Sequence, residues 1–435
     1  MDLIAGGPGL KPSLKGVANI HGRLNLPDMP SATSPWRHGL WVAGLVALFW
    51  LACFCFPAVW AATGIGEGDR PFLDLHGLLA AADARQAGVN PYLPNNFDPY
   101  HRPHVYSSWW LELRRLGLGR SDTIWLGSVL VAAVLLMAVF MVRPVTRREG
   151  VALLLLLASP ALLLAINRAN NDLVVFIIIS LGLLCFHRET WVWRALGVGL
   201  LAVSAVLKYS PLTTLVVLLD FRSRRSFLGG LALYGLVLAL AWPSLGEGFH
   251  SALKYNPAPY WIYAYGAPVL LRDLEIQASS AWLWPAILLV AWAGMQARPA
   301  LTRQEPAGPA RTAEREFMCG AALLVGLFFL GSTFVYKLLF AVWLLPWLLR
   351  PGAGGSEPGW CRATWNLLLL VVWLEGTVAV EINLLAGPLS EATAHGLLKT
   401  TLVITQLATW ALVACLLRFV LGYAARRART LWVGA

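Results

Sequence analysis

The sequence predicts an all-α integral membrane protein with about 12 transmembrane helices. Of its 435 residues, 58% are hydrophobic and only 13% are charged, a composition that a water-soluble domain could not hide inside one core. A hydrocarbon layer of about 30 Å needs roughly 20 mostly apolar residues per helical crossing, and such runs recur along the chain. Lipid excludes open sheets and loops because their backbone groups would lack hydrogen-bond partners.

The apolar runs give the predicted helices in order along the chain. Two of them, 211–220 and 338–349, are short and could be half-helices or re-entrant segments, so the number of crossings could differ by about two. We expect the helices at 39–62, 122–142, 150–166, 173–187, 195–208, 211–220, 227–243, 281–297, 317–335, 338–349, 364–383 and 397–417.

A polar leader precedes the first apolar run. The leader spans 1–38, and the apolar run begins only near Gly39, so the start of the chain does not resemble a cleaved signal peptide. We expect a disordered, cytoplasmic leader followed by one polytopic membrane domain over 39–435.

The positions of the basic residues indicate how the chain is oriented in the membrane. A formal net charge of +11 could suggest nucleic acid, but the Lys and Arg residues form short clusters at the ends of apolar runs, which is typical of cytoplasmic loops. With the amino terminus in the cytoplasm, 22 of the 34 Lys and Arg residues fall on the cytoplasmic side. We therefore expect a multi-pass cell-membrane protein with both termini cytoplasmic, bound to membrane lipids and not to nucleic acid.

The six cysteines do not suggest disulfides. Five lie in apolar runs, and Cys361 lies in a basic loop. No two cysteines lie together on the extracytoplasmic side, where a disulfide could form, so we expect all six to be reduced.

Two outer segments, 63–121 and 244–280, are too long to be simple turns. In the first, apolar residues recur at helical spacing from Asp74 onward, which predicts an amphipathic helix lying along the membrane interface. A second amphipathic stretch covers Trp109–Leu118. The predicted apolar faces consist of Leu75, Leu78, Leu79 and Ala82 in the first helix and Trp109, Trp110, Leu113 and Leu116 in the second.

Five ionisable residues lie in or beside predicted spans, where an ionised side chain costs free energy and therefore indicates a partner or a function. The predicted topology places all five on the outer side, although they come from separate parts of the sequence. Arg168 and Asp172 flank Asn170 and Asn171 in a tight connection between two helices. The full set is Asp74, Arg168, Asp172, Lys208 and Lys337.

Converging Arg and Lys side chains suit a phosphate or pyrophosphate, because Arg offers a bidentate fork and Lys a compact charge. A carboxylate among them could act as general base toward a hydroxyl. The structural alternative is that the cations extend to the interface and that Asp74 and Asp172 cap helices. The arrangement of all five on one side favours the functional interpretation.

Other polar residues on the outer side are weaker candidates. Asp69 lies in a Gly-containing linker and ranks second as a base. Four histidines could carry protons or bind hydroxyls, and the aromatic run Tyr255–Tyr265 could stack on sugars or anchor at headgroups. No spacing indicates a metal site, and Walker, HExxH and GxSxG motifs are absent, so we expect no cofactor. The histidines are His76, His101, His104 and His250.

Four short segments carry a resemblance to a known family. Because of these segments, the chain resembles the polytopic GT-C type glycosyltransferases, and more specifically glycosyltransferase family 87, whose members are mannosyltransferase-like. The segments are Phe72–His76 with Gly88–Tyr92, Asn167–Asp172, Leu207–Pro211, and Tyr336–Phe340 with Pro346.

The resemblance implies a GT-C-like fold and an enzyme that transfers a sugar from a polyprenyl-phosphate donor to a lipid or glycan acceptor at the outer face. It implies Asp74 as general base, with two interfacial helices framing the site. It also implies that Arg168, Lys208 and Lys337 hold the donor phosphate. The supporting residues would be Asn170, Asn171, Asp172, His76 and Tyr336.

Two other functions stay open at this point. A transporter or flippase could bind an anionic lipid or sugar phosphate through the same cations, although transporters usually place such sites near the midplane and between repeated halves. A non-catalytic assembly factor would tolerate neutralisation of all five ionisable residues.

Overall fold

The computed structural model describes residues 36–62, 71–188, 190–221, 223–255, 263–274, 276, 281–297, 306–350, 357–385 and 390–432. These residues are almost entirely helical, which confirms the all-α class. Their only sheet is a two-residue antiparallel pair in which Ala264 lies opposite Phe334 and Tyr265 opposite Thr333. The predicted leader and Asp69 lie outside the described residues.

The described elements include one long connection, residues 87–107 between α3 and η1. In order they are α1 (Trp36–Cys55), α2 (Pro57–Ala62), α3 (Leu73–Gln86), η1 (Ser108–Leu116), η2 (Arg120–Asp122), α4 (Thr123–Val142), α5 (Arg147–Leu157), α6 (Pro160–Arg168), α7 (Asp172–Phe186), α8 (Trp191–Leu207), η3 (Ser210–Asp220), α9 (Arg224–Tyr255), β1 (Ala264–Tyr265), α10 (Ala267–Asp273), α11 (Leu283–Ala297), α12 (Gly308–Phe329), β2 (Thr333–Phe334), η5 (Val335–Leu344), α13 (Leu345–Leu349), α14 (Pro358–Leu385) and α15 (Glu391–Trp432).

Within the described ranges, four helices are long and apolar enough to cross a membrane, and the bent pair α5 and α6 makes a fifth if it counts as one span. Other predicted crossings correspond to shorter apolar helices, including α7, α8, η3 and α11. Membrane-spanning character is therefore supported, and the predicted number of crossings is not. The four long segments are Arg37–Cys55, Arg120–Val142, Arg224–Tyr255 and Ala392–Trp432.

Several predicted helix boundaries are wrong. The predicted helix 150–166 is broken into α5 and α6, which meet at an angle of 56°, because Pro160 cannot continue the hydrogen bonding of the preceding turn and starts a new helix instead. The predicted helix 227–243 continues through Pro243 to Tyr255, so the predicted outer segment 244–280 begins as helix.

Two further predicted helices are too short, because we ended them where charged residues begin. We expected helices at 317–335 and 397–417, but α12 begins at Gly308 and α15 ends at Trp432. Both extensions carry arginines that pair with buried carboxylates. Ion pairing compensates the charges that led us to end these helices early.

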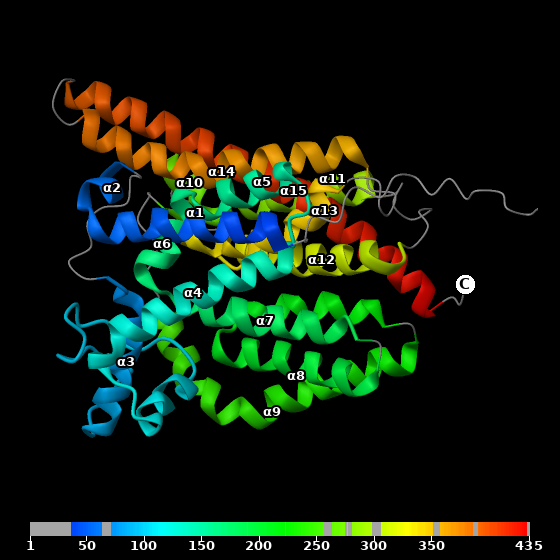
Figure 1. The fold of residues 1–435 in the computed structure, drawn as a ribbon, viewed down its shortest axis with the longest axis horizontal. Coiled ribbons are helices and arrows are strands. Elements are labelled where there is room, and N and C mark those ends of the chain that lie inside the picture. Colours follow the sequence, from blue (N-terminus) through cyan, green and yellow to red (C-terminus); the bar gives the residue numbers. More distant parts are fainter. Residues whose placement is uncertain are drawn as a thin grey trace, which may run out of the picture.

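Helices α7, α8 and α9 lie side by side in one layer, and α14 pairs with α15 on the far side of the molecule (Figure 1). Helix α12 lies between these groups, where it contacts η3, η5 and α15. The core between them is apolar and aromatic, and the rings of Trp343 and Phe176 stack with their centroids 5.0 Å apart. All six cysteines are free, as predicted.

The segment 63–121, predicted to lie on the outer side, is structured over its described part, residues 71–121, as expected. Helix α3 begins beside Asp74, and its predicted apolar face is buried. The second predicted amphipathic stretch, Trp109–Leu118, forms a 3₁₀ helix, η1. The prediction of its apolar face is only partly correct. Trp110 and Leu111 are buried, whereas Leu116 is 75% exposed at the helix end, just before Gly117 turns the chain in the left-handed region with φ of 82°.

Candidate functional site

The start of α3 is fixed against the end of α6. Phe72 adopts a left-handed conformation with φ of 61°, and its backbone N–H donates to the carbonyl of Asn167 at 2.6 Å. Its ring occupies space that Gly127 of α4 leaves open, since a Cβ at Gly127 would lie 2.3 Å from the ring. Asp74, in the first turn of α3, is thereby held beside the end of α6.

Asp74 accepts four hydrogen bonds. Its Oδ1 accepts from Arg168 Nη2 at 2.7 Å and from Arg102 Nη1 at 3.2 Å. Its Oδ2 accepts from Arg168 Nε at 3.0 Å and from Asn170 Nδ2 at 2.7 Å. The Arg168 contact is a bidentate fork, the strongest common geometry for this pair. Burial raises the pKa of Asp74, but Arg168, Asn170 and Arg102 outweigh burial and hold that pKa below its ordinary value.

Asn170 connects Asp74 to the rest of the site. The turn that carries it is closed by Ala169 in a left-handed conformation with φ of 41°. The amide of Asn170 donates to Asp74 and also to the hydroxyl of Tyr336 at 2.9 Å. Its side-chain oxygen accepts from Lys208 Nζ at 3.0 Å. One buried amide therefore links groups from α3, η5 and the end of α8.

Lys208 is held on several sides. Besides its bond to Asn170, its ammonium donates to Asn171 Oδ1 at 2.7 Å and pairs with Asp172 Oδ2 at 2.7 Å. The ammonium also lies 5.4 Å from the ring centre of Tyr106. The charge of Lys208 is thus largely compensated by Asp172.

A single cavity of about 700 Å³ is lined by the predicted base and the three predicted cations, whereas the predicted supporting residues Asn170, Asn171 and Asp172 are not among its lining residues. Asp74, Arg168, Lys208 and Lys337 all line it, although they come from four separate segments. Lys337 differs from the other two cations, because in the described part of the chain its ammonium makes no ion pair or hydrogen bond. It is the cation most available to an incoming anion.

Not every predicted residue reaches this cavity. His76 contacts Thr123 Oγ1 at 3.2 Å and lines a different hollow on the other side of α3, so its predicted supporting role is not favoured. His101 and His250 contact backbone carbonyls at 3.1 and 2.8 Å. His104 does line the cavity, and burial lowers its pKa to about 4, so that the ring is neutral.

Sequence reasoning missed Arg102 and Tyr106. Arg102 donates to Asp74, to the Leu73 carbonyl at 3.0 Å and to Asp98, with which it pairs at 2.9 Å. Asp98 and Arg102 are four residues apart, but they lie in a loop, where that spacing does not predict an ion pair as it does on a helix. Neither Arg102 nor Tyr106 therefore carries a sequence signal, because the position of each depends on tertiary structure.

The donor set suits an anion. Among the described residues, no three His, Cys, Asp or Glu side chains lie close enough together to hold a metal ion. Arg168, Lys208 and Lys337 instead line one cavity together with Arg102 and two carboxylates, Asp74 and Asp98. Such a site can hold a phosphate and orient a hydroxyl beside Asp74.

Comparison with protein-family models, curated proteins and solved structures finds no match to this chain. The resemblance to glycosyltransferase family 87 therefore stays a prediction, and the site itself must carry the functional argument.

Proposed function

We propose that this protein is a membrane glycosyltransferase that moves a sugar from a polyprenyl-phosphate donor to a hydroxyl of a lipid or glycan acceptor. One observation carries the proposal. Asp74 and three cations, Arg168, Lys208 and Lys337, line a single cavity of about 700 Å³, a size that suits a sugar phosphate. A lipid-linked donor also fits the absence of a Walker motif from the sequence.

The reaction needs one base and a stabilised leaving group. The acceptor oxygen bonds to the anomeric carbon, the bond from that carbon to the donor phosphate oxygen breaks, and the hydroxyl proton passes to Asp74. The departing phosphate gains negative charge, which Lys337 can neutralise without first losing another partner. Arg168 also lines the cavity and keeps Asp74 oriented through its bidentate contact.

Four donors to Asp74 make it a weak base. An attacking hydroxyl must displace one donor, and Arg102 makes the longest of these bonds, at 3.2 Å, from a side chain that is 32% exposed. A hydroxyl becomes strongly acidic once its oxygen bonds to the anomeric carbon, so a weak base suffices when proton transfer follows bond formation.

We extend the proposal to the membrane arrangement. In this arrangement the protein is polytopic and GT-C-like, with about 12 spans as expected from the sequence, and α3 and η1 lie along the outer interface. Both termini are then cytoplasmic, and the cavity opens to the outer side, where polyprenyl-linked sugars are delivered.

Lys337→Gln tests the assignment of the donor phosphate. We expect the KM for the polyprenyl-phosphate sugar to rise about ten-fold or more, because a charge-assisted contact to the phosphate is lost. Little loss of stability is expected, since the Lys337 ammonium has no partner among the described residues. Steady-state kinetics with varied donor measures the effect.

Lys399→Gln is the matched control, because Lys399 lies on α15 and does not line the cavity. Its donor KM should match that of the wild type. Equal KM values for the Lys337 variant and the wild type would remove Lys337 from the phosphate site.

The pH dependence of transfer is a further prediction. The pKa of Asp74 lies below its ordinary value of 3.8, and that of His104 is about 4, so neither group changes charge above about pH 5. Asp74 is then ionised and His104 neutral throughout the range. We expect no acid limb in initial rates between about pH 5 and 7. An acid limb in that range that disappears in His104→Gln would contradict this assignment.

A further inference from the structure

Arg102 lies between two carboxylates that line the cavity, Asp74 and Asp98. Its Nε and Nη2 contact Asp98 Oδ2 at 3.0 and 2.9 Å, and its Nη1 donates to Asp74 Oδ1 at 3.2 Å. The proposed reaction uses Asp74 and gives no role to Asp98. The same guanidinium group therefore joins the assigned base to a second carboxylate.

Asp98 holds Arg102 more firmly than Asp74 does. The side chain of Asp98 is 5% exposed, and its Oδ1 accepts from the backbone N–H of Tyr100 at 2.8 Å. Two of the three guanidinium nitrogens of Arg102 contact Asp98, and Nη2 also donates to the carbonyl of Leu73 at 3.0 Å. Only Nη1 reaches Asp74, so this one bond can break while the other contacts of Arg102 persist.

A glycine of α3 allows this arrangement. Gly77 lies three residues after Asp74, on the same face of the helix, and it also lines the cavity. A Cβ at Gly77 would lie 2.8 Å from Arg102 Nη2 and 2.9 Å from Asp98 Oδ2, too close for either contact. Glycine at this position therefore lets the pair of Arg102 and Asp98 lie directly on α3, beside the base.

The other two side chains that donate to Asp74 are held more tightly. Arg168 binds both of its oxygens as a fork, at 2.7 and 3.0 Å, and Asn170, which is 1% exposed, donates at 2.7 Å. Arg102 makes a single, longer bond from a side chain that is 32% exposed. Without that bond, Asp74 Oδ1 keeps one donor and can accept another from a hydroxyl.

We propose that Arg102 is a positioning residue that covers the base until an acceptor arrives. Its Nη1 occupies Asp74 Oδ1 until an acceptor hydroxyl replaces it, and Asp98 keeps the charge of Arg102 paired afterwards. This inference rests on the proposed function, in which Asp74 receives the proton of the acceptor.

Covering the base protects the donor from water. In hydrolysis, the oxygen of water bonds to the anomeric carbon, the bond from that carbon to the phosphate oxygen breaks, and a proton of the water passes to Asp74, which gives free sugar and polyprenyl phosphate. A lipid or glycan acceptor makes further contacts that offset the lost Arg102 bond, whereas water does not. The arrangement thus favours transfer over loss of the donor.

Arg102→Met and Asp98→Asn should have opposite effects. Methionine cannot bond to Asp74, so donor hydrolysis without acceptor should rise about ten-fold and the acceptor KM should fall, because a charged hydrogen bond that competes with the hydroxyl is lost. Asp98→Asn removes the second carboxylate, so Arg102 stays on Asp74, hydrolysis falls and the acceptor KM rises. Release of labelled free sugar measures hydrolysis, with the polyprenyl-phosphate sugar and the acceptor that support transfer by the wild type.

A double variant serves if Arg102→Met does not fold, since that substitution leaves Asp98 buried without its cation. Arg102→Met combined with Asp98→Asn removes both charges, and asparagine can still accept the bond from Tyr100. This variant should also raise hydrolysis. Adding Asp74→Asn to either variant should remove the extra hydrolysis, because the uncovered base is then absent.

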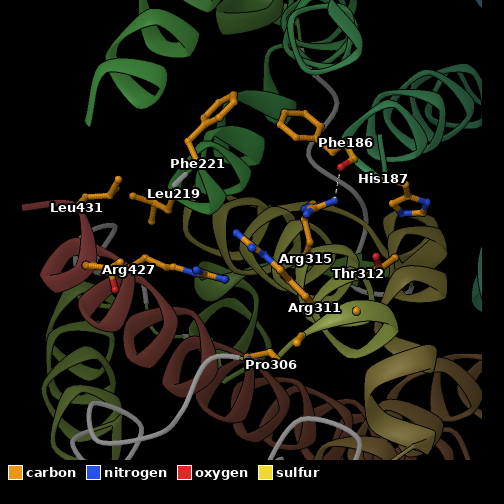
Figure 2. A pocket seen from close by; sticks show the side chains of 13 residues that line it. Phe186, His187, Leu219, Phe221, Pro306, Arg311, Thr312, Arg315, Arg427 and Leu431 are labelled. Carbon is orange, nitrogen blue, oxygen red and sulfur yellow. Dashed lines mark hydrogen bonds between the residues drawn. The ribbon is translucent and has the colours of Figure 1, made fainter. Parts of the chain in front are cut away.

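Two arginine variants control for effects unrelated to the base. Arg120→Met removes an arginine that contacts another aspartate of α3, Asp83, at 3.0 Å and does not line the cavity. Arg311 contacts buried Asp220 at 2.9 Å and lines a different cavity of about 630 Å³, where Figure 2 shows it together with other arginines. Arg311→Gln thus weakens a buried ion-pair cluster away from the base, and it tests whether lower stability alone raises hydrolysis. Both variants should keep the wild-type ratio of hydrolysis to transfer.

Three results would overturn this inference and leave the proposed function intact. They are hydrolysis that rises in neither the single nor the double Arg102 variant, changes of the same sign in Arg102→Met and Asp98→Asn, and an equal rise in Arg120→Met or Arg311→Gln. Absence of transfer by the wild type with every donor tested would instead overturn the proposed function, and this inference with it.

Discussion

We expect replacement of Asp74 by asparagine to lower the rate of sugar transfer by ~10²- to 10⁴-fold, the usual contribution of a general base. Asparagine keeps the shape of the side chain but cannot accept the proton of the attacking hydroxyl. The loss should appear mainly in kcat, because Lys337, which binds the donor phosphate in this proposal, makes no hydrogen bond or ion pair with Asp74. Initial rates with purified protein and a polyprenyl-phosphate sugar measure both parameters.

Asp83→Asn is a closely matched control for this experiment. Asp83 lies on the same helix, its side chain is 16% exposed against 13% for Asp74, and it also contacts two arginines, Arg114 and Arg120. It lines a different hollow and does not reach the cavity. Near-normal transfer by Asp74→Asn, or an equal loss in the two variants, would exclude Asp74 as the base.

The second large effect concerns stability. Asp220→Asn should lower the free energy of unfolding by about 3–5 kcal/mol, because it leaves three arginines without their shared carboxylate in a buried cluster. Denaturant unfolding in detergent measures the change.

Asp122→Asn provides the comparison for Asp220. Asp122 accepts hydrogen bonds from the backbone of Gly119 on Oδ2 and from Trp125 on Oδ1 at the start of α4, and asparagine, with one acceptor oxygen, keeps only one of the two. The free energy of unfolding should fall only slightly, by no more than the usual net contribution of one hydrogen bond. A similarly small effect for Asp220→Asn would mean that the arginine cluster does not depend on that carboxylate.

Much of the helical framework could be predicted from the sequence because apolar runs and polar breaks are local signals. Helices α4, α7 and α11 lie within a few residues of their expected positions. The meeting of Asp74 with Arg168 was also foreseeable. An ionised side chain beside a membrane span is energetically costly, so side chains of this kind that the predicted topology places on one side are expected to converge.

The remaining features depend on contacts between distant residues. Asp220 and Arg427 are 207 residues apart, and no pattern of spacing indicates that they pair. The same pairs stabilise the charged ends of α12 and α15, which explains why both helices extend beyond their apolar runs. Arg102 likewise becomes part of the first site only after its loop has folded over α3.

The most direct test of the central claim is incubation of the purified protein, reconstituted in vesicles, with polyprenyl-phosphate sugars labelled in the sugar, together with lipid and glycan acceptors. We expect label to move to an acceptor, free polyprenyl phosphate to accumulate in equal amount, and Asp74→Asn to slow both. Label that stays on its carrier but crosses the bilayer would contradict the account and indicate a transporter or flippase.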